Sequence, residues 1–307
     1  MAKIQILMAV YNGSEFLARQ LESVLGQSFA DWELLISDDC STDNSLEIIE
    51  SYCKRDRRIR LILDGIHFGN AKSHFMALLR EANAPYVMTC DQDDVWNLDK
   101  IEVTLDAMMQ HEIAGAPLLV CTDLCVVDKS LNVISPSMLS YSGMDADQTH
   151  FGYFLASCLV TGCTMMVNAS LLKLLQMPVE VDQIIMHDWW ASLVASAFGK
   201  VIYLKQATIQ YRQHGDNSVG AFHIRLFNFF SVFKQKCEIE KAALKQAKEF
   251  KRVYGGLITV KLNNQLNAFL AIEDSGPLKK LVTLTKAKIW RSSIFKNIGT
   301  YFAFLFV

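Results

Sequence analysis

Residues 86–94, with the sequence YVMTCDQDD, decide the fold class, because an apolar run stops abruptly at three carboxylates. Two earlier apolar runs end in the same way, Ile4–Val10 at Tyr11-Asn12 and Trp32–Ile36 at Asp38-Asp39. Segments with apolar residues at helical spacing separate these runs, so strands and helices alternate. That order predicts an α/β fold with a Rossmann-like, mostly parallel central sheet flanked by helices. Because the carboxyl ends of parallel strands meet at one edge of a sheet, we expect the polar clusters to lie together there.

The second half of the chain is less regular. Its patterns predict a β-hairpin over 118–127 and 132–134, a helix over 189–198 and a strand over 201–211. From residue 223 onward the pattern is helical and basic. The sequence therefore predicts two parts, a main domain over 1–222 and a helical C-terminal extension over 223–307.

The net charge of −2 conceals an asymmetry between these two parts. Residues 1–222 carry 15 Lys and Arg against 27 Asp and Glu, whereas residues 223–307 carry 15 against 5. An acidic body suits a bound metal, and a basic, aromatic-rich helical tail suits an anionic membrane surface. The alternatives for the tail are a subdomain packed on the sheet and a homodimer contact. Nucleic-acid binding is excluded because the body is acidic and carries no recognition motif.

The eight cysteines form no CxxC pair and mostly lie in apolar runs, which indicates free thiols in a reducing compartment. The chain enters a strand almost at once, without a signal peptide, and no apolar run reaches the roughly 20 residues of a membrane span. We therefore expect a cytoplasmic protein, peripheral at the inner face of the cell membrane if the tail binds lipid. The sequence contains no GxGxxG, P-loop or GxSxG motif, which argues against dinucleotide-binding, P-loop and serine-hydrolase sites.

The carboxylates of Asp91, Asp93 and Asp94 would repel one another at a strand end unless a cation or water compensates them. Oxygen ligands of this kind suit Mg²⁺ or Mn²⁺, and such ions bind the phosphates of nucleotides. A solvated acidic loop is the alternative. Asp38 and Asp39 can accept hydrogen bonds from a base or a ribose, or can simply form a turn and a helix cap.

Two further polar segments could carry chemistry. In His187-Asp188-Trp189-Trp190 a carboxylate base stands beside a flat apolar platform on which a sugar could stack; an N-cap aspartate with two core aromatics is the alternative. In the loop after residue 211, Arg212 could contact phosphate, and His214 could bind a metal or assist the leaving group. A polar surface loop is the alternative there.

Four motifs together resemble the family-2 glycosyltransferases, a bacterial group with the GT-A fold. They are Ala9-Val10-Tyr11-Asn12, Asp38-Asp39-Cys40-Ser41-Thr42-Asp43, the DxD motif Asp91-Gln92-Asp93, and His187-Asp188-Trp189. The resemblance covers roughly residues 3–220. The chain departs from the family pattern in two places, where Ala9-Val10 replaces a proline before the turn and Cys40 replaces a glycine.

The resemblance implies roles for individual residues. Asp188 would be the catalytic base and Asp93, with His214, would bind Mn²⁺ or Mg²⁺. The nucleotide-sugar donor would contact Val10, Tyr11, Asn12, Asp38, Asp39, Lys72, Asp91, Gln92, Asp93, Gly162 and Arg212. The acceptor side of the cleft would be lined by Asp123, His187, Trp189 and Trp190.

The combination of motifs is most similar to the rhamnosyltransferase-type subgroup of surface-polysaccharide assembly. It implies inverting transfer of L-rhamnose from dTDP-L-rhamnose, with UDP-sugars as the other donors, to a hydroxyl of a polysaccharide or lipid-linked glycan. Two other functions stay open from the residues alone. One is a metal-dependent nucleotidyltransferase or nucleotide-sugar hydrolase, and the other is a non-catalytic nucleotide-sugar-binding subunit.

Overall fold

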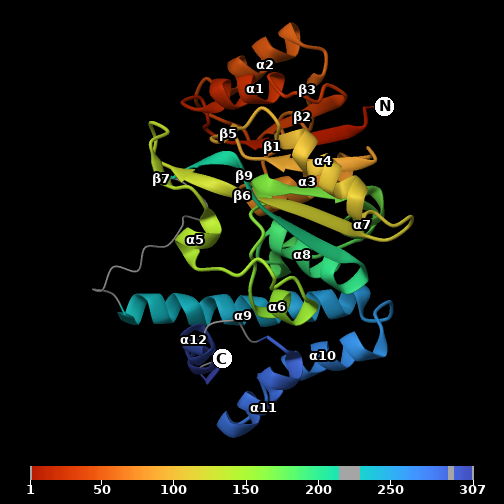
Figure 1. The fold of residues 1–307 in the computed structure, drawn as a ribbon, viewed down its shortest axis with the longest axis vertical. Helices are drawn as coiled ribbons and strands as arrows, with labels where there is room; N and C mark the ends of the chain where they lie inside the picture. Colours follow the sequence, from red (N-terminus) through yellow and green to blue (C-terminus); the bar gives the residue numbers. More distant parts are fainter. Residues whose placement is uncertain (1, 214–228, 290–293, 306–307) are drawn as a thin grey trace.

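The structure is a computed structural model that describes residues 2–213, 229–289 and 294–305 of the 307-residue chain. His214, the predicted second metal ligand, lies outside the described residues. The described elements form one central sheet with helices on both sides and a helical C-terminal region below it (Figure 1).

The first half of the chain builds the parallel part of the sheet. Its strands are β1 (Ile4–Val10), β2 (Trp32–Asp38), β3 (Ile59–Leu61) and β4 (Tyr86–Cys90), and β1 pairs in parallel with both β2 and β4. The intervening helices are α1 (Leu17–Leu25), α2 (Ser45–Arg55) and α3 (Ala71–Glu81), followed by α4 (Lys100–His111). β1 and β2 are almost wholly buried, as expected for strands that helices cover on both faces.

The second half completes the sheet with strands of both directions. These are β5 (Val95–Trp96), β6 (Leu118–Val127), β7 (Val133–Ser135), β8 (Met165–Asn168) and β9 (Lys200–Arg212). The strand order is β3-β2-β1-β4-β8-β6-β9-β5, and β7 pairs with β6. The antiparallel β6–β7 pair confirms the predicted hairpin. β6 and β9 pair in parallel, and β8 runs antiparallel to both of its neighbours, β4 and β6.

Short helices connect these strands. They are α5 (Met138–Ser142), α6 (Phe151–Ala156), α7 (Ala169–Leu175) and α8 (His187–Phe198), with single 3₁₀ turns η1 (Gly162–Thr164) and η2 (Val181–Gln183). The C-terminal region consists of α9 (Phe229–Tyr254), α10 (Val260–Leu270), α11 (Pro277–Ala287) and α12 (Ile294–Leu305). No helix in the described part of the chain is long and apolar enough to cross a membrane.

The long helix α9 joins the C-terminal helices to the body. It crosses the molecule with α8 above it and α10, α11 and α12 below it (Figure 1), and α6 packs against it through Phe151 and Phe250. The Trp190 ring of α8 packs at 6.0 Å from Phe250 and 5.8 Å from Tyr254, and the Tyr254 hydroxyl donates to the Leu174 carbonyl at 2.7 Å. One continuous hydrophobic core therefore runs across the boundary predicted at residue 222, which itself stays a prediction.

Replacing Tyr254 by alanine should destabilise the whole protein and not only its tail, because the side chain is completely buried between the two parts. Removing a buried aromatic ring of this size costs about 3–5 kcal/mol. The free energy of unfolding by urea would show this loss in a single transition. Leu257→Ala is the matched control, since Leu257 is 59% exposed and should change stability little. A separate early transition of the C-terminal helices would contradict the shared core.

Candidate active site

The three polar clusters that follow β1, β2 and β4 lie together, as predicted. The Asp39 amide donates to the Val10 carbonyl at 2.8 Å, which joins the ends of β1 and β2. The Tyr11 amide donates to Gln92 Oε1 at 2.9 Å, and Gln92 Nε2 donates back to the Tyr11 carbonyl at 3.0 Å. This reciprocal pair fixes the DxD loop against the first turn. A Cβ on Gly13 would lie 2.4 Å from Gln92 Oε1, so any larger residue there would push the Gln92 amide out of this pair.

The turns at the first two strand ends hold each other through backbone and side-chain bonds. The Asn12 amide donates to Ser41 Oγ at 2.8 Å, and Asn12 Oδ1 accepts from the Thr42 amide at 2.8 Å. Asp38 accepts from the Ser41 amide and hydroxyl at 2.8 and 2.6 Å, so its carboxylate shapes the loop. Cys40 has a φ of 56°, in the left-handed region that favours glycine, which is the residue the family pattern has at this position.

Asp39 and Lys72 bring the segment after β3 to the same edge. The Asp39 carboxylate is buried and accepts from the amides of Phe68 and Gly69, the latter at 2.9 Å, and it lies 3.0 Å from His67 Nδ1. Lys72 Nζ donates to the Ile184 carbonyl at 2.9 Å, close to the start of α8. Their predicted contacts with a nucleotide stay predictions.

Beyond β4 the carboxylates crowd together in a largely buried space. One ligand atom from each of Asp91, Asp94 and Cys163 lies within 4.8 Å of the others. Burial, followed by the charges of Asp93 and Asp188, raises the pKa of Asp91 to about 7. Burial is also the main cause that raises the pKa of Asp94 well above its usual range, and the charges of Asp93 and Asp91 act in the same direction. Among the described residues Asp94 Oδ2 has no hydrogen-bond partner, although it is buried.

These observations fit a divalent cation. Repelling carboxylates with an unpartnered buried oxygen form a donor set that a cation would stabilise, and carboxylate oxygens suit Mg²⁺ and Mn²⁺. The predicted ligand Asp93 lies beside this set and influences the pKa values of both Asp91 and Asp94. The grouped atoms themselves come from Asp91, Asp94 and Cys163. Burial raises the pKa of the Cys163 thiol, and sulfur suits Mg²⁺ and Mn²⁺ poorly, so Asp91 and Asp94 are the oxygen donors of this group.

Arg212 ties the acidic loop to the end of β9. Its amide donates to Asp94 Oδ1 at 3.1 Å, its Nε donates to the Asp93 carbonyl at 2.8 Å, and its guanidinium also donates to the Lys129 carbonyl. The guanidinium carbon lies 4.5 Å from the centre of the Phe16 ring. Arg212 thus holds the acidic loop through the Asp93 carbonyl and the Asp94 carboxylate, and its predicted contact with phosphate stays a prediction.

Asp188 lies across this cluster from Asp91. It stands in the first turn of α8, accepts from the Trp189 amide at 2.6 Å, and also accepts from the backbone of Gly162. Burial raises the pKa of Asp188 to about 6, against the effect of these amide donors. A carboxylate with this pKa near neutral pH is well matched to accept a proton.

Three predicted cleft residues belong to the protein interior instead, which corrects the prediction. His187 is buried and stacks on Phe75 at 4.2 Å, and Trp190 is fully buried against α9. Asp123 is 2% exposed and accepts bonds from the Ser137 hydroxyl, the amides of Leu124 and Met138, and the Tyr203 hydroxyl, so it organises β6 and α5. In each case the side chain satisfies packing or hydrogen bonds within the fold.

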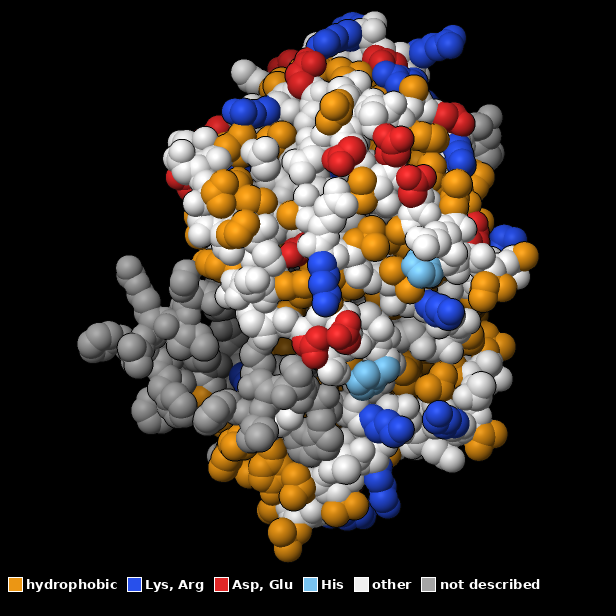
Figure 2. All heavy atoms as spheres, in the orientation of Figure 1, with side chains coloured by type: hydrophobic (Ala, Val, Ile, Leu, Met, Phe, Trp, Pro, Cys, Tyr) orange, Lys and Arg blue, Asp and Glu red, His pale blue; other side chains and the backbone are white. Residues whose placement is uncertain are grey.

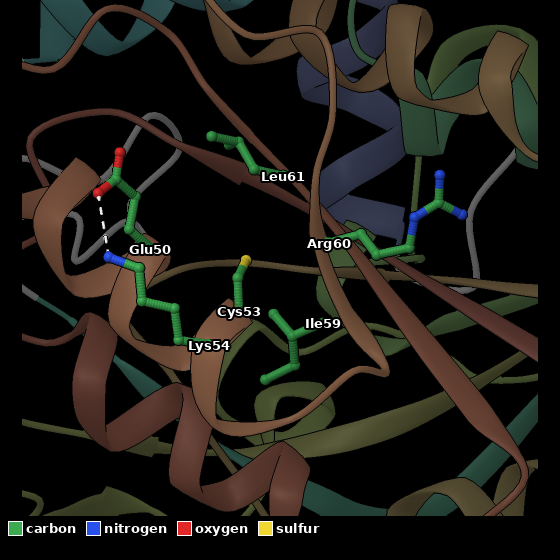
Figure 3. A pocket seen from close by; sticks show the side chains of 6 residues that line it. All are labelled: Glu50, Cys53, Lys54, Ile59, Arg60 and Leu61. Carbon is green, nitrogen blue, oxygen red and sulfur yellow. Dashed lines mark ion pairs between the residues drawn. The ribbon is translucent and has the colours of Figure 1, made fainter.

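Trp189 differs from these residues because it lines a cavity of about 310 Å³. The other walls come from residues 142–145, α6 and Ile239 of α9. Cys158 also lines this cavity, and burial followed by the charge of Asp188 raises the pKa of its thiol. Asp188 itself does not line the cavity, but its chain neighbour Trp189 and the nearby Cys158 do. A larger cavity of about 410 Å³ lies at the other end, between α2 and β3, where Glu50 pairs with Lys54 (Figure 3). It contains no residue of the site.

Lys100 is a further residue near the acidic loop, where the charge of Asp94 acts on it; no motif in the sequence indicates a role for it. Its side chain is completely buried, its Nζ has no hydrogen-bond partner among the described residues, and it lies 4.8 Å from the Trp96 ring. Burial lowers the pKa of Lys100 to about 8, while Cys163, Cys90 and Asp94 act in the opposite direction. In the sequence, its position in the first turn of a helix that follows the acidic loop is the feature that could have indicated this placement.

The chain matches a known protein family and several individual proteins. Residues 5–170 match the model of glycosyl transferase family 2. The chain is 31% identical over 232 residues to the dTDP-rhamnosyl transferase RfbG of Shigella flexneri, covering 70% of this chain and 74% of that protein. It is 32% identical over 178 residues to the putative teichuronic acid biosynthesis glycosyltransferase TuaG of Bacillus subtilis, covering 57% of this chain and 66% of that protein.

Solved structures share the fold at low sequence identity. The structure of S. aureus TarS in complex with UDP-GlcNAc matches with a TM-score of 0.54 at 15% identity, covering 93% of this chain and 90% of that one. The mannosyltransferase PcManGT of Pyrobaculum calidifontis, in complex with GDP-Man and Mn²⁺, matches with a TM-score of 0.57 at 12% identity, covering 99% and 85%. These similarities establish the GT-A-like fold.

Gly162→Ala tests whether the close packing around Asp188 is needed. The added methyl group would lie 2.6 Å from His187 Nε2 and 3.6 Å from Asp188 Oδ2, so the buried His187 ring, next to Asp188, must move. Such overpacking costs about 1–3 kcal/mol. We expect a lower Tm and a fall in turnover. Gly256→Ala is the control, because no atom lies within 4 Å of the added carbon. Equal behaviour of the two variants would show that the contact is unimportant.

Proposed function

The chain belongs to glycosyl transferase family 2 and is a glycosyltransferase, and from this premise we propose that it is an inverting, metal-dependent enzyme acting on a nucleotide-sugar donor. The acceptor is a hydroxyl of a polysaccharide or lipid-linked glycan. One observation carries the proposal, namely that Asp188, with a pKa raised to about 6, faces the DxD carboxylates closely enough to raise the pKa of Asp91. Base and donor site therefore share one space.

The nucleotide binds at the joined strand ends in this proposal. Tyr11 is 53% exposed there and offers a ring face for a pyrimidine base. Asp39 and Asp91 supply carboxylates for the base and the ribose, and the bonded Tyr11–Gln92 pair holds the two turns at a fixed separation. Because hydrogen bonds within and between the turns already order this surface, it needs no rearrangement to bind a ligand.

For the donor, we propose dTDP-L-rhamnose first. Its support is the similarity to a protein that is named a dTDP-rhamnosyl transferase and that aligns over 232 residues. Other relatives carry other names, such as a UDP-Glc-dependent glucosyltransferase of Escherichia coli at 32% identity over 112 residues. UDP-sugars are therefore the second donors to test.

A divalent cation, Mn²⁺ or Mg²⁺, would be held by Asp93, with Asp91 and Asp94 beside it. When bound, such an ion supplies Lewis-acid stabilisation of the negative charge on a departing diphosphate. The chain's own part is to position these carboxylates, which Arg212 does by bonding to the Asp93 carbonyl and to Asp94.

Asp188 takes the proton from the acceptor hydroxyl as that oxygen attacks the anomeric carbon. The bond to the diphosphate breaks on the opposite face, so one displacement inverts the configuration. The cavity beside Trp189 is the route by which we propose that the acceptor reaches this base. Because two backbone amides hold the Asp188 carboxylate, its orientation is set before the substrate binds.

The donor site can be tested by calorimetry with dTDP and UDP, with and without Mn²⁺ or Mg²⁺. We expect binding that needs the metal and that Asp93→Ala abolishes, because the ion links protein and phosphates. Asp106→Ala is the control, since it removes an exposed carboxylate of α4 that lies outside the site. Absence of binding to either nucleotide under every metal condition would refute the proposed donor site.

The role of Asp188 predicts a specific loss of turnover. A positioned general base contributes about 10²–10⁴-fold, so Asp188→Asn should reduce kcat by that factor while nucleotide binding is retained. Wild-type kcat should fall as the pH drops through about 6, because the base must be ionised. An ordinary aspartate would keep activity down to about pH 4. Donor cleavage that proceeds equally without any acceptor would favour hydrolysis instead.

A further inference from the structure

Helix α11 presents a row of apolar side chains to the outside of the molecule. Leu278, Leu281 and Val282 are 84%, 44% and 52% exposed and share one helix face at the spacing i, i+3, i+4. The opposite face, with Leu284 and Ala287, is fully buried. Figure 1 shows α11 at the end of the molecule opposite α2, and Figure 2 shows hydrophobic side chains gathered at that end. We call Leu278, Leu281 and Val282 the α11 row.

The chain from α11 onward is basic, although the exposed Glu273 and Asp274 stand just before the helix, where Glu273 pairs with Lys248. Residues 275–307 contain six Lys and Arg and no Asp or Glu. Lys279 and Lys286 are exposed on α11 itself. On the face shown in Figure 2, acidic side chains lie over the upper and middle parts, whereas the lower end carries Lys and Arg beside hydrophobic groups. The row therefore fits an anionic partner with an apolar interior.

The α11 row lies on a support that the fold has already ordered. Gln265 of α10 donates to the Ala287 carbonyl at 2.7 Å, and the Tyr301 hydroxyl of α12 donates to the Pro277 carbonyl at 3.1 Å. Lys280 points inward, and its ammonium donates to the Phe304 carbonyl at 2.7 Å. Both ends of α11 are thus tied to neighbouring helices. Its outer face is exposed although the helix itself is well packed.

The aromatic side chains of the tail do not form this surface, which refines the sequence-based expectation of an aromatic-rich anchor. Phe250, Phe269 and Phe304 are fully buried and pack within the core. Other exposed apolar residues of the tail lie apart from α11, at Ile239, Leu257, Val260, Ile298 and Phe302. Within α11 three exposed apolar residues share one helix face.

We propose that the α11 row docks the enzyme onto an anionic lipid bilayer, with its aliphatic side chains in the headgroup–acyl boundary and the flanking lysines among the lipid headgroups. Interfacial helices combine an apolar face with Lys and Arg in this way. A second copy of the chain is less suited to the row, because in a symmetric dimer the lysines that flank the row on one copy would face and repel those on the other. The inference concerns where the enzyme sits and does not depend on the donor, the acceptor or the mechanism.

The test is co-sedimentation of the full-length protein with vesicles of phosphatidylcholine alone and of phosphatidylcholine mixed with phosphatidylglycerol. We expect binding to the mixed vesicles that added salt weakens. Leu278→Asp with Leu281→Asp should abolish it. Lys279→Glu with Lys286→Glu should lower the partition coefficient more than tenfold, since each basic residue near an anionic surface contributes about a factor of five.

The matched control is Leu257→Asp with Val260→Asp, which alters two residues that are 59% and 77% exposed but lie outside α11. It should bind the mixed vesicles as the wild type does, and unchanged circular dichroism would show that each variant is folded. Binding lost equally in the control, or no binding of the wild type, would overturn the proposal. A wild-type dimer in light scattering that the α11 variants dissociate would assign the row to a second copy instead.

Discussion

The mutual repulsion of carboxylates at the ends of the central strands is the constraint on which the rest of this molecule depends. Asp91, Asp93 and Asp94 follow β4 directly, and the start of α8 brings Asp188 to the same space. In this poorly solvated site, burial and the neighbouring charges raise the pKa values of Asp91 and Asp94, so these two groups retain protons that a bound cation would displace. Arg212 holds the loop in place by donating hydrogen bonds to the Asp93 carbonyl and the Asp94 carboxylate.

The parts of the fold that rest on local patterns could be predicted from the sequence. Apolar runs ending in polar clusters indicated β1, β2 and β4 and their common edge, and the hairpin of β6 and β7 followed from its turn residues. The order in which β8, β6 and β9 complete the sheet could not be predicted, because that order depends on long-range pairing, which leaves little trace in local spacing.

The same division applies to the candidate site. Asp91, Asp188 and Gly162 lie close together, and the resemblance had assigned all three to one site; their roles there stay predictions. Trp190, His187 and Asp123 were misjudged for another reason. An aromatic or carboxylate next to a functional residue looks the same in the sequence whether it faces a cleft or the core. Successive residues of a helix point about 100° apart, so Trp190 points in a different direction from Trp189. Its ring packs against α9.

The bonds from Arg212 to the acidic loop also have a consequence for the order of assembly during synthesis. Residues 91–94 leave the ribosome more than a hundred residues before Arg212 does, and β9 must then insert between β6 and β5 to reach them. Loop closure over that distance makes the final strand a late, slow step. Until β9 is in place, a nascent chain carries the acidic loop without its tether. The acidic loop therefore reaches its final position only after Arg212 has left the ribosome.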